Sequence, residues 1–243
     1  MSNRLKHLSW SQLKEMKETT NLVIIPTGSI EANGLHLPLG LDTIVAERLA
    51  GLVASKVKAV VGPTLEVGDS SSLDDFPGTL VIRPEHFKLY LEDICRSLIK
   101  WGFKDILFIN GHGKNVPIIT QLADTLQEFD EVRSAQVEVW KFIKFQGENN
   151  TESAEIGHYH GGEAGTSVML YLEPDLVDVS QWVNEPQRDA DLFPEIIKYK
   201  KLSTLTKSST IGNATLGTAE KGKFLVEMAV GRIEDFLKNE WNA

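Results

Sequence analysis

The chain has little cysteine and no long apolar run. Its single cysteine, Cys95, cannot form a disulfide within the chain, which argues against a disulfide-stapled secreted scaffold and a cysteine-based zinc finger. No stretch reaches the roughly 18 uninterrupted apolar residues that a transmembrane helix needs. The polar N-terminus, MSNRLKHLSW, also lacks the apolar core of a signal peptide. We therefore expect a cytoplasmic protein that does not bind membranes.

Basic residues are also in the minority. The sequence has 25 Lys and Arg against 34 Asp and Glu, a formal net charge of −9. Such a chain is a poor binder of polyanions, so we expect no nucleic-acid partner. A hydrophobic content of 42% with 24% charged residues is ordinary for a globular protein and excludes disorder, collagen and coiled coil. A chain of 243 residues can bury a large core, and we expect residues 1–243 to form a single domain.

Apolar runs alternate with helical periodicity along the chain. LVIIP at 22–26 and DILFIN at 105–110 are continuous apolar runs typical of buried strands, and shorter patterns predict strands within 58–67 and at 137–142. Residues 146–155 are polar and predict a loop. Strands that alternate with helices favour βαβ units, so the predicted fold class is α/β with a largely parallel sheet covered by helices on both faces. Apolar spacing predicts these helices at 43–56, 84–101, 116–126, 162–172 and 219–238.

Candidate ligand-binding residues follow the two clearest strands. In open parallel sheets, ligands bind outside the carboxyl ends of the strands. Carboxylates and imidazoles gathered there are ligands for Zn²⁺, Mn²⁺ or Fe²⁺, and two carboxylates in one loop suit a dinuclear site because a carboxylate can bridge two cations. The first loop holds Glu31, Asn33, His36 and Asp42, the second holds His112, Lys114 and Asn115, and a third cluster before the helix at 162–172 holds His158, His160 and Glu163.

Each of these residues also has an ordinary structural interpretation. Asp42 is placed to cap the helix that follows it, and Glu163 favours a helix N-terminus. His112 in its glycine-rich turn and His160 on a polar segment could serve no ligand at all. The metal-site interpretation depends on convergence, because similar groups occur at two successive strand ends that this architecture brings together.

Five segments in order resemble the motifs of one family. The chain resembles the creatininase (creatinine amidohydrolase) family, whose pattern G-S-x-E-Q-H-G-P-H-L-P-L-x-x-D is similar to GSIEANGLHLPLGLD at 28–42. The family's F-P-G-T occurs at 76–79, and its N-G-H-G-G-N is similar to NGHGKN at 110–115. Its H-A-G-E-x-E-T-S resembles HGGEAGTS at 160–167, and a late G-x-P-x-x-A-T-x-E-K-G resembles 212–222.

The resemblance spans about residues 20–235 and implies a fold and a site. The family is a three-layer αβα sandwich with a mostly parallel central sheet, and it forms homohexamers with a dinuclear metal site. The resemblance implies that Glu31 and His112 bind one metal, that Asp42 bridges both metals and that Glu163 binds the second. His160 resembles the catalytic histidine that moves a proton to the leaving group. We expect Zn²⁺ or Mn²⁺, with Fe²⁺ as an alternative, at one or two ions per chain.

The chain departs from the family pattern around the second metal. Asn33 replaces a metal-binding histidine, so it binds through its amide oxygen, or His36 helps, or the second metal is weak or absent. Lys114 stands where creatininase has a metal-binding glutamate, and it either neutralises a loop carboxylate or contacts a substrate oxygen. Ser70 begins the stretch SSSL, where the family has S-x-E-H, and Gly165 replaces a glutamate. We assign Ser70, His36 and Lys114 to substrate binding.

These residues predict a metal-dependent hydrolase for a small polar substrate. In this interpretation, a metal-bound hydroxide attacks the carbonyl of a cyclic amide or a related compound, and His160 with Glu163 completes the catalytic group. The altered pocket argues against creatinine itself. One alternative is C–C hydrolysis of a cyclic inositol-derived diketone of the 3-dehydro-inosose type. Another is a non-catalytic relative, which Asn33 favours and the retained Glu31, Asp42 and His112 oppose.

Overall fold

The computed structural model describes residues 2–147, 160–186, 196 and 198–243. Its centre is a parallel sheet with the strand order β2-β1-β3-β4. The two inner strands are completely buried, as their continuous apolar sequences predict. The strands are β1 (Leu22–Thr27), β2 (Val60–Val61), β3 (Asp105–Asn110) and β4 (Arg133–Glu138).

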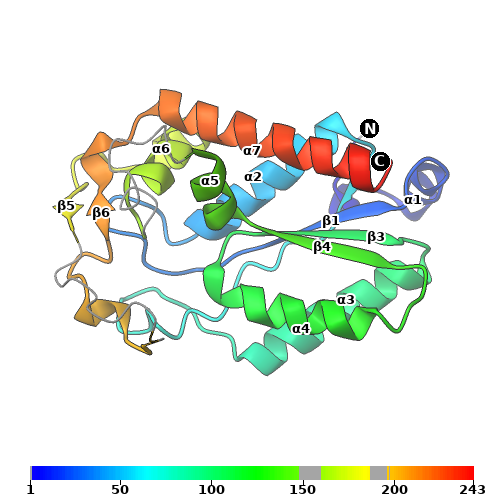
Figure 1. Ribbon diagram of the computed structural model, residues 1–243, viewed down its shortest axis with the longest axis horizontal. Helices are drawn as coiled ribbons and strands as arrows, with labels where there is room; N and C mark the ends of the chain where they lie inside the picture. Colours follow the sequence, from blue (N-terminus) through cyan, green and yellow to red (C-terminus); the bar gives the residue numbers. More distant parts are fainter. Residues whose placement is uncertain (1, 148–159, 187–195, 197) are drawn as a thin grey trace.

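Helices cover both faces of the sheet (Figure 1). Ile24, Leu107 and Ile109 point to one face and pack with α2, α5, α6 and α7. Ile25 and Phe108 point to the other face and pack with α3 and α4. This alternation of side chains follows from the two-residue period of a strand. The helices are α2 (Leu41–Lys56), α3 (Pro84–Lys100), α4 (Val116–Leu126), α5 (Val139–Gly147), α6 (Glu163–Leu172) and α7 (Ala219–Glu240).

Smaller elements lie outside these layers. Helix α1 (Trp10–Lys17) begins with a capping box, in which Ser9 and Gln12 satisfy each other's backbone amides. A short antiparallel pair joins β5 (Asn184–Glu185) to β6 (Gly212–Asn213). The 3₁₀ turns are η1 (Leu5–His7), η2 (Gly113–Asn115), η4 (Pro174–Leu176), η5 (Leu202–Thr204) and η6 (Ala214–Leu216).

The predicted α/β fold, with a parallel sheet between helices, is confirmed. Within the described residues, none of the helices has the length and apolarity needed to cross a bilayer. That the whole chain forms one domain stays a prediction. Of the loop predicted at 146–155, residues 148–155 lie outside the described part of the chain, while 146 and 147 belong to α5.

Two local predictions were wrong, and a third, the strand within 58–67, is confirmed as a strand but is shorter than expected. The strand expected at 137–142 ends at Glu138, because the Glu138 carboxylate accepts hydrogen bonds from the backbone amides of Trp140 (3.2 Å) and Lys141 (3.0 Å) and starts α5 there. Asp42 does not cap α2, since the helix already begins at Leu41 after Gly40. The strand expected within 58–67 is reduced to Val60–Val61 and one isolated bridge.

The register of the strands places the segments that follow β1, β3 and β4 at one end of the sheet. Thr27, Asn110 and Glu138 are aligned partners at the carboxyl ends of β1, β3 and β4. The chain leaves each strand at the same level, so side chains from three distant segments meet above this edge. The candidate site described next lies there.

Candidate metal centre

Glu31, Asp42 and His112 converge at the carboxyl end of the sheet. Each offers one ligand atom, and these atoms all lie within 4.8 Å of one another. Glu31 comes from the loop after β1, Asp42 from the first turn of α2, and His112 from the loop after β3. All three side chains are buried, which is unusual for charged groups unless they are paired or bind an ion.

The hydrogen bonds of His112 direct one ring nitrogen toward the carboxylates. Nε2 lies 2.9 Å from the backbone oxygen of Asp69 and donates to it, so Nδ1 is the nitrogen available to the site. Nδ1 lies 3.1 Å from Asp42 Oδ2 and 3.3 Å from Glu31 Oε2. A metal-binding histidine commonly donates its other N–H to a carbonyl in this way. Two carboxylates and one such imidazole fit a divalent cation such as Zn²⁺ or Mn²⁺.

The charges of Glu31, Asp42 and His112 favour a bound cation. Burial works to lower the pKa of His112, but the hydrogen bond with Asp42 and the charges of Glu31 and Asp42 outweigh it and raise this pKa to about 9. Burial, followed by the charge of Asp42, raises the pKa of Glu31. Two buried carboxylates therefore attract positive charge, which the His112 imidazolium supplies when no metal is bound.

Hydrogen bonds from outside the group orient both carboxylates. Ser29 Oγ donates to Asp42 Oδ2 at 2.8 Å, and Trp140 Nε1 donates to Asp42 Oδ1 at 2.9 Å. Ser70 Oγ donates to Glu31 Oε2 at 2.5 Å. Ser70, predicted to bind substrate, is thus buried behind Glu31. Trp140, which no motif of the sequence singles out, also belongs to the site.

His160 lies beside the three converging residues. Its Nε2 donates to the backbone oxygen of Ala32 at 2.7 Å, and its Nδ1 lies 4.0 Å from Glu31 Oε1. Gly161 follows with φ +59°, and a Cβ there would come within 3.0 Å of the backbone of Asn33. The glycine therefore allows the His160 turn to pack directly on the loop after β1.

A cavity of about 480 Å³ opens over these groups. Glu31, Asp42, His112 and His160 line it together with Asn33. Its walls combine this polar group with apolar side chains and with two lysines. The apolar wall includes Leu41, Leu73, Trp140 and Leu202, and the lysines are Lys114 and Lys141.

Asn33 and Lys114 line the cavity, and among the described residues they complete no second group of metal-binding side chains. Asn33 Nδ2 donates to the backbone oxygen of Glu31 at 3.3 Å. Lys114 Nζ lies 3.3 Å from Asp69 Oδ2 and donates to Ser71 Oγ at 2.5 Å. Lys114 therefore does neutralise a loop carboxylate, one of its two predicted roles, while its contact with a substrate stays a prediction.

Two other predicted residues do not line this cavity. His36 is buried, its Nε2 lies 2.8 Å from Thr166 Oγ1, and burial lowers its pKa to about 4. Glu163 is completely buried at the start of α6, and its Oε1 accepts a hydrogen bond from Lys221 Nζ at 2.7 Å. His158 lies outside the described residues. The metal role of Glu163 and the substrate role of His36 stay predictions.

The chain is similar to several known proteins over nearly its whole length. The family model for creatinine amidohydrolase, named Creatininase, matches residues 6–237. The mycofactocin precursor peptide peptidase of Mycolicibacterium smegmatis is 29% identical over 95% of this chain and 90% of its own length. The 3-dehydro-scyllo-inosose hydrolase of Thermotoga maritima is 26% identical over 96% of this chain and 81% of its own. A solved structure of manganese creatininase superimposes with a TM-score of 0.88 at 24% identity and covers 100% of both chains.

Proposed function

The chain belongs to the creatininase family of hydrolases, and from this premise we propose that it is a metal-dependent hydrolase that cleaves an amide bond in a small polar substrate, cyclic or open. One observation carries the proposal: Glu31, Asp42 and His112 converge with His160 in a single cavity. Lysines and an apolar wall in the same cavity leave room for an organic substrate beside a bound ion.

Glu31, Asp42 and His112 are the residues that would hold the cation. A divalent ion bound there would activate a water molecule and polarise the substrate carbonyl. Water adds to the carbonyl carbon, the C–N bond breaks, and the products are a carboxylate and an amine. The leaving nitrogen needs a proton in order to depart as a neutral amine.

His160 is placed to move that proton. Its Nε2–H is fixed on the Ala32 carbonyl, so Nδ1 is the atom that faces the cavity near Glu31. Nδ1 can accept a proton from the attacking water and pass it to the leaving nitrogen. The anchored ring needs no reorientation between the two steps, which favours proton transfer.

The geometry supports one cation per chain more than two. Each oxygen of Asp42 accepts one hydrogen bond, one from Ser29 and one from Trp140, and keeps a lone pair for a cation, so the difference between one ion and two depends on the other residues of the cavity. The amide of Asn33 and the ammonium of Lys114 line the cavity where further anionic ligands would be needed for a second ion. We propose Zn²⁺ or Mn²⁺ at the three converging residues, with Fe²⁺ as the alternative.

Metal analysis tests the proposal. Protein purified without chelator should contain close to one transition metal per chain by plasma mass spectrometry. His112→Ala should lose the metal, whereas His160→Ala should retain it and lose turnover of its substrate. Wild-type protein with well under one metal per chain would overturn the mechanism, and two metals per chain would restore a bridging Asp42.

Two other functions remain as alternatives. The relative named 3-dehydro-scyllo-inosose hydrolase supports hydrolysis of a C–C bond in a cyclic polyol ketone, in which a carbanion rather than an amine accepts the proton. A non-catalytic role is favoured by Asn33 alone. A screen of cyclic amides, formamides, peptides and cyclic polyol ketones against metal-loaded protein separates these functions, with His160→Ala as the inactive control.

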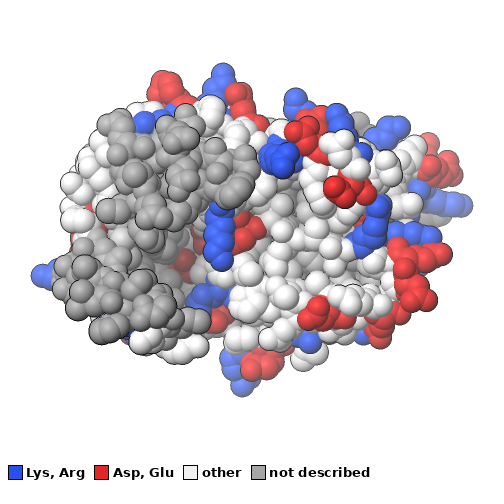
Figure 2. All heavy atoms as spheres, in the orientation of Figure 1, with Lys and Arg blue, Asp and Glu red and all other residues white. Residues whose placement is uncertain are grey.

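The expected partners are a small-molecule substrate and further copies of the chain. Large apolar side chains such as Leu35, Leu80 and Val81 are 59%, 51% and 44% exposed, which supports a homo-oligomer, a hexamer as the family resemblance implies. In the described part of the face drawn in Figure 2, basic and acidic side chains are interspersed, which agrees with no nucleic-acid partner. Light scattering measures the oligomeric state, and a cytoplasmic location stays part of the proposal.

A further inference from the structure

We propose that Lys114 and Lys141 form a carboxylate-binding subsite beside the metal centre, so that the substrate carries a free carboxylate near its scissile amide. The inference rests on the proposed function and specifies its substrate class. Its starting point is that both ammonium-bearing side chains line the same cavity as Glu31, Asp42 and His112.

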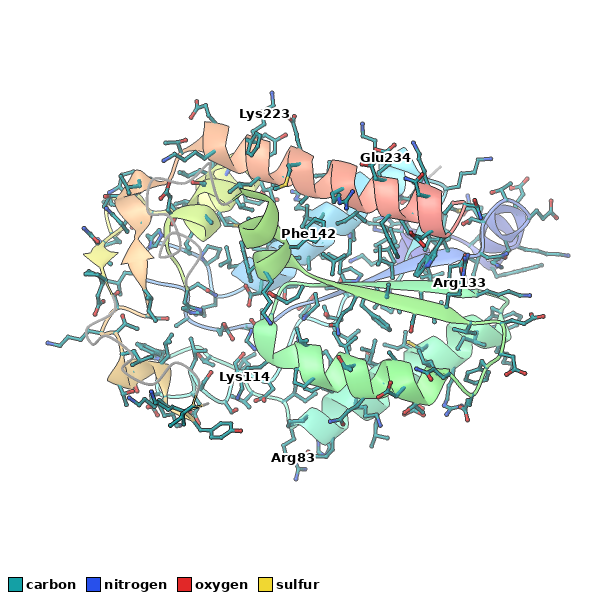
Figure 3. The ribbon with its side chains drawn as sticks, viewed as in Figure 1. Arg83, Lys114, Arg133, Phe142, Lys223 and Glu234 are labelled. Atoms are coloured by element: carbon teal, nitrogen blue, oxygen red, sulfur yellow. The ribbon has the colours of Figure 1, made fainter. Side chains whose placement is uncertain are left out.

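Neighbouring strands bring the two lysines to one edge of the sheet. Asn110 at the end of β3 pairs with Glu138 at the end of β4. Lys114 follows the first of these strand ends and Lys141 follows the second. Figure 3 labels Lys114 where the chain enters α4, and it labels Phe142, the neighbour of Lys141, on α5; both lie toward the same end of the sheet. The two lysines therefore reach the cavity at the same end of the sheet, Lys114 from the α4 side and Lys141 from the α5 side.

Lys141 has no fixed partner for its ammonium group. It is exposed in the first turn of α5, and its Nζ makes no hydrogen bond or ion pair with any residue in the described ranges. The nearby Glu138, which also lines the cavity, accepts hydrogen bonds from the backbone amides of Trp140 and Lys141, and its charge attracts the Lys141 ammonium. The exposed Lys141 ammonium has no hydrogen bond within the described residues that a ligand would have to displace.

Lys114 is held in place and still has donor capacity. Its Nζ contacts Asp69 Oδ2 and donates to Ser71 Oγ, which occupies two of its three N–H groups. The side chain is 41% exposed, so the third N–H can reach a ligand. An ammonium fixed in this way loses less conformational freedom when a carboxylate binds.

An anionic group is the ligand that these neighbours favour. A divalent ion at the three converging residues replaces the proton of His112 and adds one net positive charge to the cavity, and a neutral substrate would cover the lysines without adding a negative charge to compensate them. Hydrogen bonds between ammonium and carboxylate groups are roughly twice as strong as neutral ones. The apolar wall formed by Leu73 and Leu202 would hold the carbon chain that links the carboxylate to the amide.

Two hydroxamates that differ in one group test the subsite. Succinic monohydroxamate carries a carboxylate, whereas butyrohydroxamate is a neutral analogue, and both bind a metal through the hydroxamate. In calorimetry on zinc-loaded protein at low salt, we expect the carboxylate compound to bind about tenfold more tightly. Lys141→Gln should reduce this preference to twofold or less and leave the affinity for butyrohydroxamate unchanged, because the Lys141 ammonium makes no hydrogen bond or ion pair with Glu31, Asp42 or His112 and the neutral compound offers it no carboxylate. Added sodium chloride should reduce the preference in the wild type.

Lys223 offers a matched control. It is an exposed lysine on α7, labelled in Figure 3; its Nζ lies 3.9 Å from Glu227 Oε1, and it is not among the residues that line the cavity. Lys223→Gln removes the same net charge as Lys141→Gln and should retain the tenfold preference. A loss of preference in Lys223→Gln equal to that in Lys141→Gln would show a general charge effect and overturn the subsite.

The outcomes separate the subsite from the proposed function. If both hydroxamates bind zinc-loaded protein with equal affinity, the subsite is refuted and the metal centre stands. If neither compound binds, the metal centre is not accessible to ligands, and the proposed function fails together with the subsite. A preference that survives in a Lys114→Gln, Lys141→Gln double variant would also refute the assignment.

Discussion

Metal binding should release a proton from His112, and this links metal affinity to pH. In metal-free protein, the hydrogen bond with Asp42 and the charges of the two carboxylates hold the pKa of His112 at about 9 in spite of its burial. At pH 7 the ring is therefore an imidazolium. A metal can bind Nδ1 only after this nitrogen has lost its proton, because Nε2 keeps its own proton for the carbonyl of Asp69.

The size of the effect follows from the distance between this pKa and the working pH. Two units separate pH 7 from a pKa of about 9. At about 1.4 kcal/mol per unit, deprotonation subtracts about 3 kcal/mol from metal binding, roughly a hundredfold in the dissociation constant. Affinity should therefore rise about tenfold per pH unit from pH 6 to 9 and level off above that range. The raised pKa of Glu31 adds to the slope at the acidic end, since its carboxyl group must also ionise.

Calorimetry in buffers of different ionisation enthalpy measures this proton directly. In a plot of the observed enthalpy of Zn²⁺ binding against buffer ionisation enthalpy, the proton from His112 should contribute about one to the slope at pH 7 and close to zero at pH 10, in addition to any proton that a metal-bound water releases. A slope near zero at pH 7 would refute the ion-pair account of the metal-free site. His160→Ala serves as the control, because His160 is no ligand in this account and its removal should leave the slope unchanged.

Two further predictions concern residues around the site. Trp140→Phe removes the donor to Asp42 Oδ1 and keeps an aromatic ring, so it should weaken Zn²⁺ binding about 10-fold to 100-fold, measured by chelator competition; an unchanged affinity would show that Asp42 needs no such support. His36 is buried, and burial lowers its pKa from 6.5 to about 4, so the unfolded chain binds more protons between these values. The contribution of His36 to the free energy of unfolding should therefore be complete above pH 6.5, and the free energy should fall by up to about 3 kcal/mol toward pH 4. In urea denaturation, the free energy of His36→Asn should decline less between these pH values than that of the wild type. An identical decline in both proteins would contradict the lowered pKa of His36.

Much of the fold follows from short apolar runs bounded by polar loops. LVIIP and DILFIN are too short for typical helices, and as central parallel strands they are buried on both faces of the sheet. The start of α3 follows from Pro84, and its end from Gly102, which has φ +89°. Because the two strands are parallel neighbours, the polar loops that follow them lie at the same edge of the sheet. The structure brings Glu31, Asp42 and His112 together there. Their role as metal ligands is still a prediction.

The end of β4 shows why the rest of the site was not predictable from local sequence. Residues 137–142, VEVWKF, have the apolar alternation of a strand, whereas the true strand, RSAQVE, is polar and only partly buried. A tertiary contact decides between them: Arg133 makes a two-pronged ion pair with Asp105 and fixes the register of β4 on β3. In an extended strand, Trp140 and Lys141 would point to opposite faces of the sheet. Because the strand ends at Glu138 and a helix begins, both side chains instead line the cavity, and the proposed carboxylate subsite depends on that change of structure.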